Sequence, residues 1–269
     1  MGLTFKKPPL LEIIAEVRWQ PMQMIDPVAG VPMPVMPHVS APYDAMFMKF
    51  AAKMGANGYE TVERVVPYGA PMMPHAPVVR LRPKLGSAEG TVYQLGPNMF
   101  SANATPPSYT SWDEFKGKVE TGVITMLDCR LPKAAELPVL ASLRYINAFR
   151  GDLLGDASTM EFLSDTLNVR IQVPEAITGQ CHDGKPILPG LQLAVPLPFG
   201  TMTAHFAEGK LDNQRAVMMD ISVVLREPIP PDAQKIMDAF SSARKVIHSV
   251  FVSLTSPISE KMQPEGADE

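Results

Sequence analysis

The sequence is poor in the residues that build metal sites and disulfide frameworks. Cys129 and Cys181 are its only cysteines, too few for a disulfide framework or for a cysteine-based zinc site. Its five histidines are scattered, and no two of them have the close spacing that grips a metal ion. We therefore expect reduced thiols, no bound metal and no cofactor.

Motifs that mark common catalytic sites are also missing. The chain has no GxxxxGK[ST], no GxGxxG that opens a helix, no GxSxG and no HExxH. Cys181, His182 and Asp183 are consecutive, but nucleophile and base normally meet through the fold and not along the chain. An Asp-Gly pair instead favours an exposed turn there. We expect no catalysis by a metal, a nucleotide or a Ser/Cys triad.

Charge and hydropathy argue against two further classes of protein. The formal net charge is −4, the pI is about 5.8 and aromatic residues make up 7% of the chain, which disfavours nucleic-acid binding. No apolar run approaches the roughly 20 residues of a membrane span. Lys6 and Lys7 interrupt the segment where a signal peptide needs an apolar stretch. We expect a soluble, cytoplasmic protein with no membrane contact.

Proline and methionine are concentrated in one segment, residues 21–42. Proline removes backbone donors and fixes φ, so neither a helix nor a central strand persists there. The alternatives are an ordinary proline-rich connection and an extended arm that contacts a partner. Unbranched thioethers adapt easily to a partner's surface. The candidate partner-binding residues are Met22, Met24, Met33 and Met36.

Periodicity predicts the main helices and strands. Residues 10–19 and 138–149 are β-rich, and residues 43–58 carry apolar residues at helical spacing. Residues 96–119 are polar and aromatic, and they predict a strand (MFSANA), a turn and then a helix to about residue 128. Ser111 and Glu114 form an expected capping box at its start, as Ser158 and Glu161 do for a short helix over 158–167. A long helix follows Pro231.

The two halves of the chain resemble one another. Arg18-Trp19 corresponds to Arg144-Tyr145, and Phe115, Gly122 and Met126 map onto Phe240, Ile247 and Phe251 at nearly the same offset. We expect an α+β fold of two tandem modules, 1–130 and 131–257, followed by a disordered tail, 258–269. Each module would hold a curved antiparallel sheet and a long C-terminal helix, in the element order of TATA-binding-protein-like or helix-grip folds.

Five further residues are candidates for a ligand site or for structural anchors. Arg18 and Arg144 each stand in a strand beside an aromatic residue, and each needs an acid, a carbonyl group or an anionic ligand. Tyr109 and Trp112 are expected to fix the loop before the helix. His248 lies beside the apolar stripe of the last helix. A structural role is the favoured interpretation for all five, and for the two arginines this role is pairing with an acid or a carbonyl group.

An ordered set of motifs resembles one bacterial family. The set is KKPPLLEIIAEVRW, YQLGPNMFSAN, YTSWDEF, LRYINAF and a last helix with HSVF. It is similar to a sporadically distributed family of bacterial proteins of about this length, whose function is uncharacterised. The resemblance covers nearly the whole chain and implies an accessory protein, but it transfers no catalytic residue. Residues 21–42 and the loop GQCHDGKPILPG depart from that pattern.

The favoured function is a non-enzymatic interaction protein that binds a protein partner, encoded nearby. The alternative is a protein that binds a hydrophobic small molecule in an apolar, helix-gripped pocket, with turnover left open. DNA binding on the sheet is a third class, which the net charge disfavours.

Overall fold

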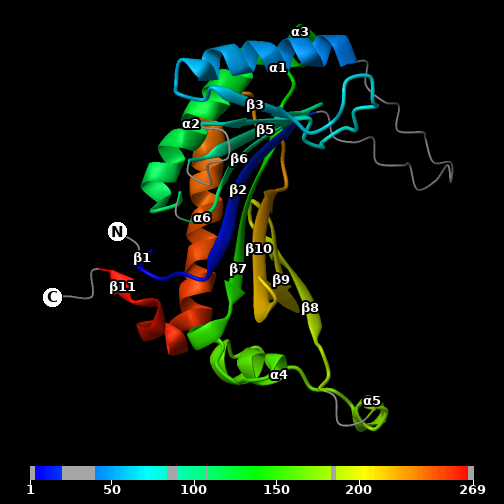
Figure 1. Cartoon of the computed structure of the whole chain (residues 1–269), viewed down its shortest axis with the longest axis vertical. Coiled ribbons are helices and arrows are strands. Elements are labelled where there is room, and N and C mark those ends of the chain that lie inside the picture. The colour runs from blue at the N-terminus through cyan, green and yellow to red at the C-terminus, as the bar shows by residue number, and fades with distance from the viewer. Residues whose placement is uncertain (1–3, 20–39, 84–89, 107, 183–185, 266–269) are drawn as a thin grey trace. The chain divides into compact units, whose positions relative to one another are not determined.

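The structure is a computed structural model that describes residues 4–19, 40–83, 90–106, 108–182 and 186–265. The fold is mixed α and β, with a large antiparallel sheet and a long helix, α6 (Ala233–Thr255), near the C-terminus (Figure 1). The hydrogen-bonded order of its strands is β3-β4-β5-β6-β2-β7-β10-β9-β8. Within the described residues, no helix has the length and apolar composition to cross a membrane.

Two units share this chain, and each takes segments from both halves of the sequence. The first unit contains residues 1–11, 144–223 and 244–269, and the second contains residues 12–143 and 224–243. Strands β2 (Leu10–Trp19), β7 (Val139–Phe149) and β10 (Gln214–Leu225) and helix α6 each contribute to both units. The division into tandem modules at residue 130 stays a prediction.

The second unit has an antiparallel sheet built from β3 (Thr61–Arg64), β4 (Val79–Arg82), β5 (Val92–Gly96), β6 (Met99–Ala104) and β2. The predicted strands 10–19 and MFSANA are therefore confirmed. Pro97 and Asn98 connect β5 to β6, and Asn98 has φ 62°, as the third position of a type II turn requires. Gly96 is necessary because a Cβ there would lie 1.8 Å from the carbonyl oxygen of Ala76.

Helices α1 (Ser40–Gly55) and α2 (Trp112–Cys129) cover one face of this sheet, and the short α3 (Pro132–Ala135) follows. The expected apolar face of α1 is buried through Met46, Phe47, Phe50 and Met54. Ser111 caps α2 by accepting the N–H of Glu114 at 3.2 Å. Only half of the expected capping box is present, because the Glu114 carboxylate binds Thr110 and Lys118 instead.

The first unit contains part of β7, strands β8 (Gly190–Leu197) and β9 (Gly200–Leu211), most of β10 and the second part of α6. Asp212 and Asn213 both have positive φ, which is typical of the type I′ turn that joins two antiparallel strands. Between β7 and β8 lie η1 (Gly151–Leu153), α4 (Thr159–Glu161), the π-helix η2 (Phe162–Thr166) and α5 (Glu175–Thr178). The capping box of Ser158 and Glu161 is complete, as predicted.

The segment after α6 differs from the sequence-based expectation of a disordered tail. Residues 256–265 form two 3-10 turns, η3 (Ser256–Ile258) and η4 (Glu260–Met262), and strand β11 (Pro264–Glu265). β11 pairs with β1 (Thr4–Phe5), and Ile258 and Met262 are buried. Two apolar residues in a polar segment are enough to attach it to the fold, which its composition alone does not predict.

Candidate functional site

The two strand arginines each have an acidic partner. Arg18 places its Nε 2.7 Å from Oε1 of Glu16, and Arg144 donates to both carboxylate oxygens of Asp220, with Nε 2.8 Å from Oδ1. Both arginine side chains are about half exposed. This geometry is the structural pairing that the sequence favours. Each arginine has an acidic side chain beside it that balances its charge without a bound anion.

The two aromatic candidates meet at a single residue of α2. The rings of Tyr109 and Trp112 lie 5.9 Å and 6.3 Å from the ring of Phe115, which is buried. Edge-to-face and tilted contacts at these distances are favourable aromatic pairs. Tyr109 and Trp112 thus attach the turn before α2 to the core.

The other residues that the sequence analysis singled out are a histidine, the two cysteines and four methionines. His248 is half-buried in α6; burial lowers its pKa, and the positive charge of Arg244 lowers it further. Cys181 is exposed after α5, while Cys129 is buried, which raises the pKa of its thiol. The candidate partner-binding residues Met22, Met24, Met33 and Met36 lie outside the described residues.

A row of polar side chains crosses the sheet of the second unit. α2 packs on the opposite face, where a Cβ at Gly122 would lie 2.7 Å from the rings of both Tyr93 and Phe100. The strand register aligns one residue from each of five strands: Glu63, Arg80, Gln94, Ser101 and Glu16. Alternation in β-strands places all five on one face.

Polar side chains on this face, both in the row and beside it, form hydrogen bonds with one another. Ser142 donates to Glu16 at 3.4 Å, and Asn103, which is buried, donates to Glu12 at 2.8 Å. Both glutamates therefore accept hydrogen bonds from polar side chains of neighbouring strands.

One buried cation was not anticipated from the sequence. Arg130 is 5% exposed, lies 4.9 Å over the ring of Trp19 and donates from Nη2 to the carbonyl oxygen of Leu137 at 2.9 Å. Burial lowers the pKa of Arg130 to about 10, and Glu136 acts in the opposite direction. The guanidinium therefore remains charged at neutral pH. It closes the C-terminal end of α2 and is attached to β2 through Trp19.

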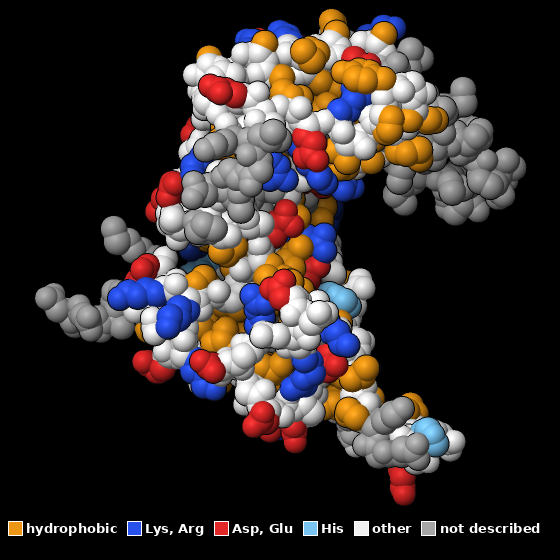
Figure 2. Space-filling view, in the orientation of Figure 1, with side chains coloured by type: hydrophobic (Ala, Val, Ile, Leu, Met, Phe, Trp, Pro, Cys, Tyr) orange, Lys and Arg blue, Asp and Glu red, His pale blue; other side chains and the backbone are white. Residues whose placement is uncertain are grey.

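Four exposed apolar side chains lie within residues 62–73 of the second unit. Val62 in β3 and Val65, Tyr68 and Met73 after it are 45%, 39%, 78% and 50% exposed; these four residues are called the Tyr68 patch below. Arg64 stacks on the Tyr68 ring at 4.0 Å and forms a 2.7 Å ion pair with Asp44 of α1. Figure 2 shows hydrophobic side chains over α1 and the segment after β3. Sequence periodicity missed this patch because it follows the end of a short strand.

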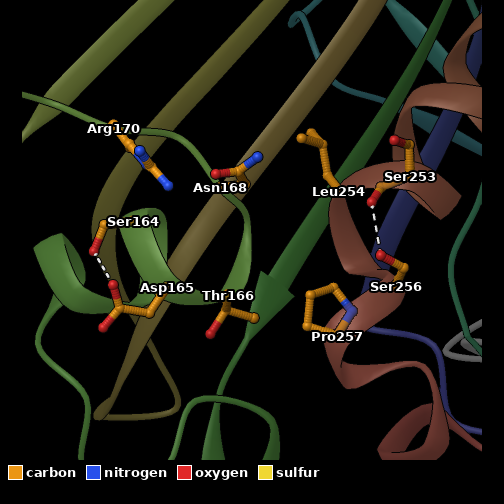
Figure 3. A pocket seen from close by; sticks show the side chains of 9 residues that line it. All are labelled: Ser164, Asp165, Thr166, Asn168, Arg170, Ser253, Leu254, Ser256 and Pro257. Atoms are coloured by element: carbon orange, nitrogen blue, oxygen red, sulfur yellow. Dashed lines mark hydrogen bonds between the residues drawn. The ribbon is translucent and has the colours of Figure 1, made fainter.

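A polar hollow of about 620 Å³ lies in the first unit, between the π-helix η2 and the C-terminal end of α6 (Figure 3). Its lining includes Thr166, Asn168, Arg170, Ser253 and Ser256. Figure 3 shows the Asp165 carboxylate turned toward Ser164, whose hydroxyl donates to it at 2.6 Å. This hollow is not the apolar, helix-gripped pocket of the alternative function, because a hydrophobic ligand here would leave these polar groups unpaired.

The described part of the chain contains no group of three His, Cys, Asp or Glu side chains placed to hold a metal ion. No family model, curated protein or solved structure matches the chain. The resemblance to a sporadically distributed bacterial family therefore stays a prediction.

Proposed function

We propose that this protein is a non-enzymatic accessory protein that binds a protein partner, and that the Tyr68 patch is its contact surface. The observation that carries the proposal is the 78% exposure of Tyr68 among Val62, Val65 and Met73. Tyrosine, methionine and arginine are enriched in protein interfaces, and exposed apolar groups that cluster mark interaction sites.

The position of Arg64 supports this assignment. Its guanidinium stacks on the Tyr68 ring and is held by Asp44, so the ring is oriented before a partner arrives. Orienting a side chain in advance lowers the entropy that binding costs. Met48, on α1 one turn after Asp44, is 62% exposed and extends the apolar surface in that direction.

Further parts of the proposal follow the sequence. The partner is encoded beside this gene, both proteins work in the cytoplasm, and the chain belongs to the sporadically distributed bacterial family described above. Residues 21–42 form a second contact through Met22, Met24, Met33 and Met36. The tandem modules of TATA-binding-protein-like or helix-grip order also belong to the proposal. The strand order supports them, because β2 and β7, the first strands of the two halves, are neighbours at its centre.

The test is binding of the intact chain to the product of the neighbouring gene, measured by calorimetry. Tyr68→Ala is expected to weaken binding by about 30-fold, the effect of losing a hot-spot residue worth about 2 kcal/mol. Ile124→Ala is the matched control, because Ile124 is an exposed apolar residue of α2 outside the patch. A chain without residues 22–39, which keeps all of α1, tests the proline-rich segment separately.

Unchanged affinity in Tyr68→Ala would remove the Tyr68 patch from the proposal. Unchanged affinity in the shortened chain would remove the arm. If the neighbouring protein does not bind at all, the proposed function itself is wrong.

A further inference from the structure

The polar hollow of the first unit lies between two walls that are far apart in the sequence. Figure 3 shows Asn168 and Arg170 on one side, with Ser253 of α6 and Ser256 of η3 on the other. All four residues belong to the first unit. The volume of about 620 Å³ is within the roughly 300–1,000 Å³ that is typical of small-molecule sites. The hollow is therefore large enough for a ligand of metabolite size.

The first wall carries an arginine whose donors are unused. Arg170 forms no hydrogen bond or ion pair with any described residue of the chain. Among the described residues that line the hollow, Arg170 is the one base and Asp165 the one acid, and the Asp165 carboxylate already accepts the hydroxyl group of Ser164. A guanidinium group pairs with a carboxylate through two parallel hydrogen bonds. This wall can therefore hold one negatively charged group.

The backbone of the first wall has an unusual hydrogen-bond pattern. η2 is a π-helix, in which the N–H of Leu167 donates to the carbonyl oxygen of Phe162, five residues earlier, at 3.1 Å. Asn168 then has φ 53°, and the N–H of Val169 returns to the carbonyl oxygen of Leu163 at 2.7 Å. Phe162, Leu163 and Leu167 are buried, so this wall is fixed to the core. π-Helical turns are rare and occur frequently at functional sites.

The second wall has the opposite charge preference. α6 ends at Thr255, and its last turn contains no basic residue. The C-terminal end of a helix carries about half a negative charge, which disfavours an anionic group and favours a hydrogen-bond donor. Ser256 donates to the carbonyl oxygen of Ser253 at 3.1 Å, whereas the Ser253 hydroxyl group has no partner within the described ranges. Hydroxyl or ammonium groups of a ligand are therefore favoured at this wall.

We propose that the hollow binds a small polar carboxylate, a hydroxy acid or an amino acid, that bridges the two walls. Its carboxylate pairs with Arg170, and its hydroxyl or ammonium group lies against Ser253 and the end of α6. A phosphate ester fits less well, because its larger negative charge would meet a single cation and the negative end of a helix. The site is independent of the Tyr68 patch, which belongs to the second unit.

The first experiment screens the intact chain against the common L-amino acids and against lactate, glycerate, gluconate and glucuronate. A probe that binds the folded chain raises its thermal midpoint in a concentration-dependent way, and the screen extends to about 10 mM. We expect a probe of at least one series to bind, which also identifies the source as an amino acid or a hydroxy acid. The methyl ester of that probe lacks the negative charge and should bind at least about 10-fold more weakly.

Two results of this screen overturn the proposal. One is that no probe of either series binds. The other is that inorganic phosphate binds more tightly than every carboxylate, which would contradict the assigned class of ligand.

A second experiment places the bound probe in the hollow by calorimetric titration of variants. Arg170→Gln should raise the dissociation constant by about 30-fold, the effect of losing a charged hydrogen-bond donor. Arg150→Gln is the matched control, because Arg150 is an arginine of the same unit that pairs with Asp212 instead. Arg170 is exposed, so Arg170→Gln should keep the wild-type thermal midpoint when no probe is present. Affinity that Arg170→Gln leaves unchanged, or that both variants reduce equally, overturns the site.

The second wall is tested with two serines of α6. Ser253→Ala should raise the dissociation constant by about 5-fold, because one neutral hydrogen bond is lost. Ser242→Ala is the control, since the Ser242 hydroxyl group already donates to the carbonyl oxygen of Asp238. Equal affinity in the two serine variants would overturn the placement of the ligand against the end of α6.

Discussion

The phenol of Tyr43 on α1 donates a hydrogen bond to Oδ1 of Asn98, 3.1 Å away, and both side chains are buried. Asn98 is the left-handed residue of the β5–β6 turn, and its carbonyl oxygen accepts the N–H of Trp19 at 3.0 Å. One asparagine therefore connects helix α1, the turn and the end of β2. This group of contacts lies at the end of the chain's first long strand.

Removing the Tyr43 hydroxyl should leave a buried acceptor without this donor. We expect Tyr43→Phe to lower the free energy of unfolding by about 1–3 kcal/mol, the cost of leaving a buried polar group unsatisfied. Denaturant unfolding should show a lower midpoint with an unchanged slope. Tyr68→Phe is the control, since Tyr68 is 78% exposed and should lose almost nothing. Equal effects in both variants would contradict the assignment.

Two glycines of α2 should respond in opposite directions to the same substitution. A Cβ at Gly122 would lie 2.7 Å from Cζ of Phe100 and from Cε1 of Tyr93, whereas a Cβ at Gly117 would meet nothing within 4 Å. Gly122→Ala should therefore destabilise by about 1–3 kcal/mol through overpacking. Gly117→Ala should stabilise by about 0.5–1 kcal/mol, because alanine loses less backbone entropy in a helix. Thermal unfolding measures both, and a stabilising Gly122→Ala would show that α2 does not approach the sheet this closely.

Local patterns predicted the secondary structure well because periodicity and capping act within one turn or strand. The apolar spacing from Phe115 to Met126 and the cap at Ser111 gave the start and approximate end of α2. Alternation at Ile13, Ala15 and Val17 identified β2, and all three residues are buried. The second hydrogen bond of the expected Ser111 capping box, from the Ser111 N–H to the Glu114 carboxylate, is replaced, because Lys118, one turn further on, donates to that carboxylate.

Sequence patterns did not predict the contacts between distant segments of the chain. The pairing of Arg144 with Asp220 depends on which strands become neighbours, and no periodicity encodes that choice. Arg130 is an ordinary cation in the sequence, and its burial against Trp19 and the carbonyl group of Leu137 depends on contacts between distant parts of the fold. Tyr68 was overlooked for the opposite reason: a tyrosine in a loop gives no sign of whether its ring is covered. The polar hollow beside η2 likewise depends on the end of α6 returning to that helix.

The Arg144–Asp220 pair should be worth a modest, salt-dependent amount. Two parallel N–H···O bonds favour it, but the arginine side chain is 48% exposed, which limits the gain through solvent screening. A double-mutant cycle with Arg144→Gln and Asp220→Asn should give a coupling free energy of about 1 kcal/mol at low salt. High salt should reduce it. The Lys261→Gln/Asp113→Asn cycle should give none, because these two residues do not pair with each other in the described structure and Lys261 donates to the carbonyl oxygen of Asp152 instead. An absent coupling at low salt would indicate that Arg144 binds something other than this carboxylate.

His248 should make the fold less stable in mild acid. Burial and the nearby charge of Arg244 lower the pKa of His248 below its ordinary value of 6.5. As the pH falls through 6.5, His248 becomes protonated in the unfolded chain but remains neutral in the folded chain. The unfolded state therefore binds more protons, and the free energy of unfolding decreases. The decrease ends once the pH is below the pKa of the folded state, where both states carry the proton.

We expect His248→Gln to flatten this part of the stability profile and to leave the profile above pH 7 nearly parallel to that of the wild type. His205→Gln is the control, since His205 is exposed on β9. Denaturant unfolding at a series of pH values checks the slope, and a proton NMR titration of the folded chain checks the pKa directly. A His248 resonance that titrates above 6.5 would reverse the sign and show that an acidic group, not Arg244, dominates its surroundings.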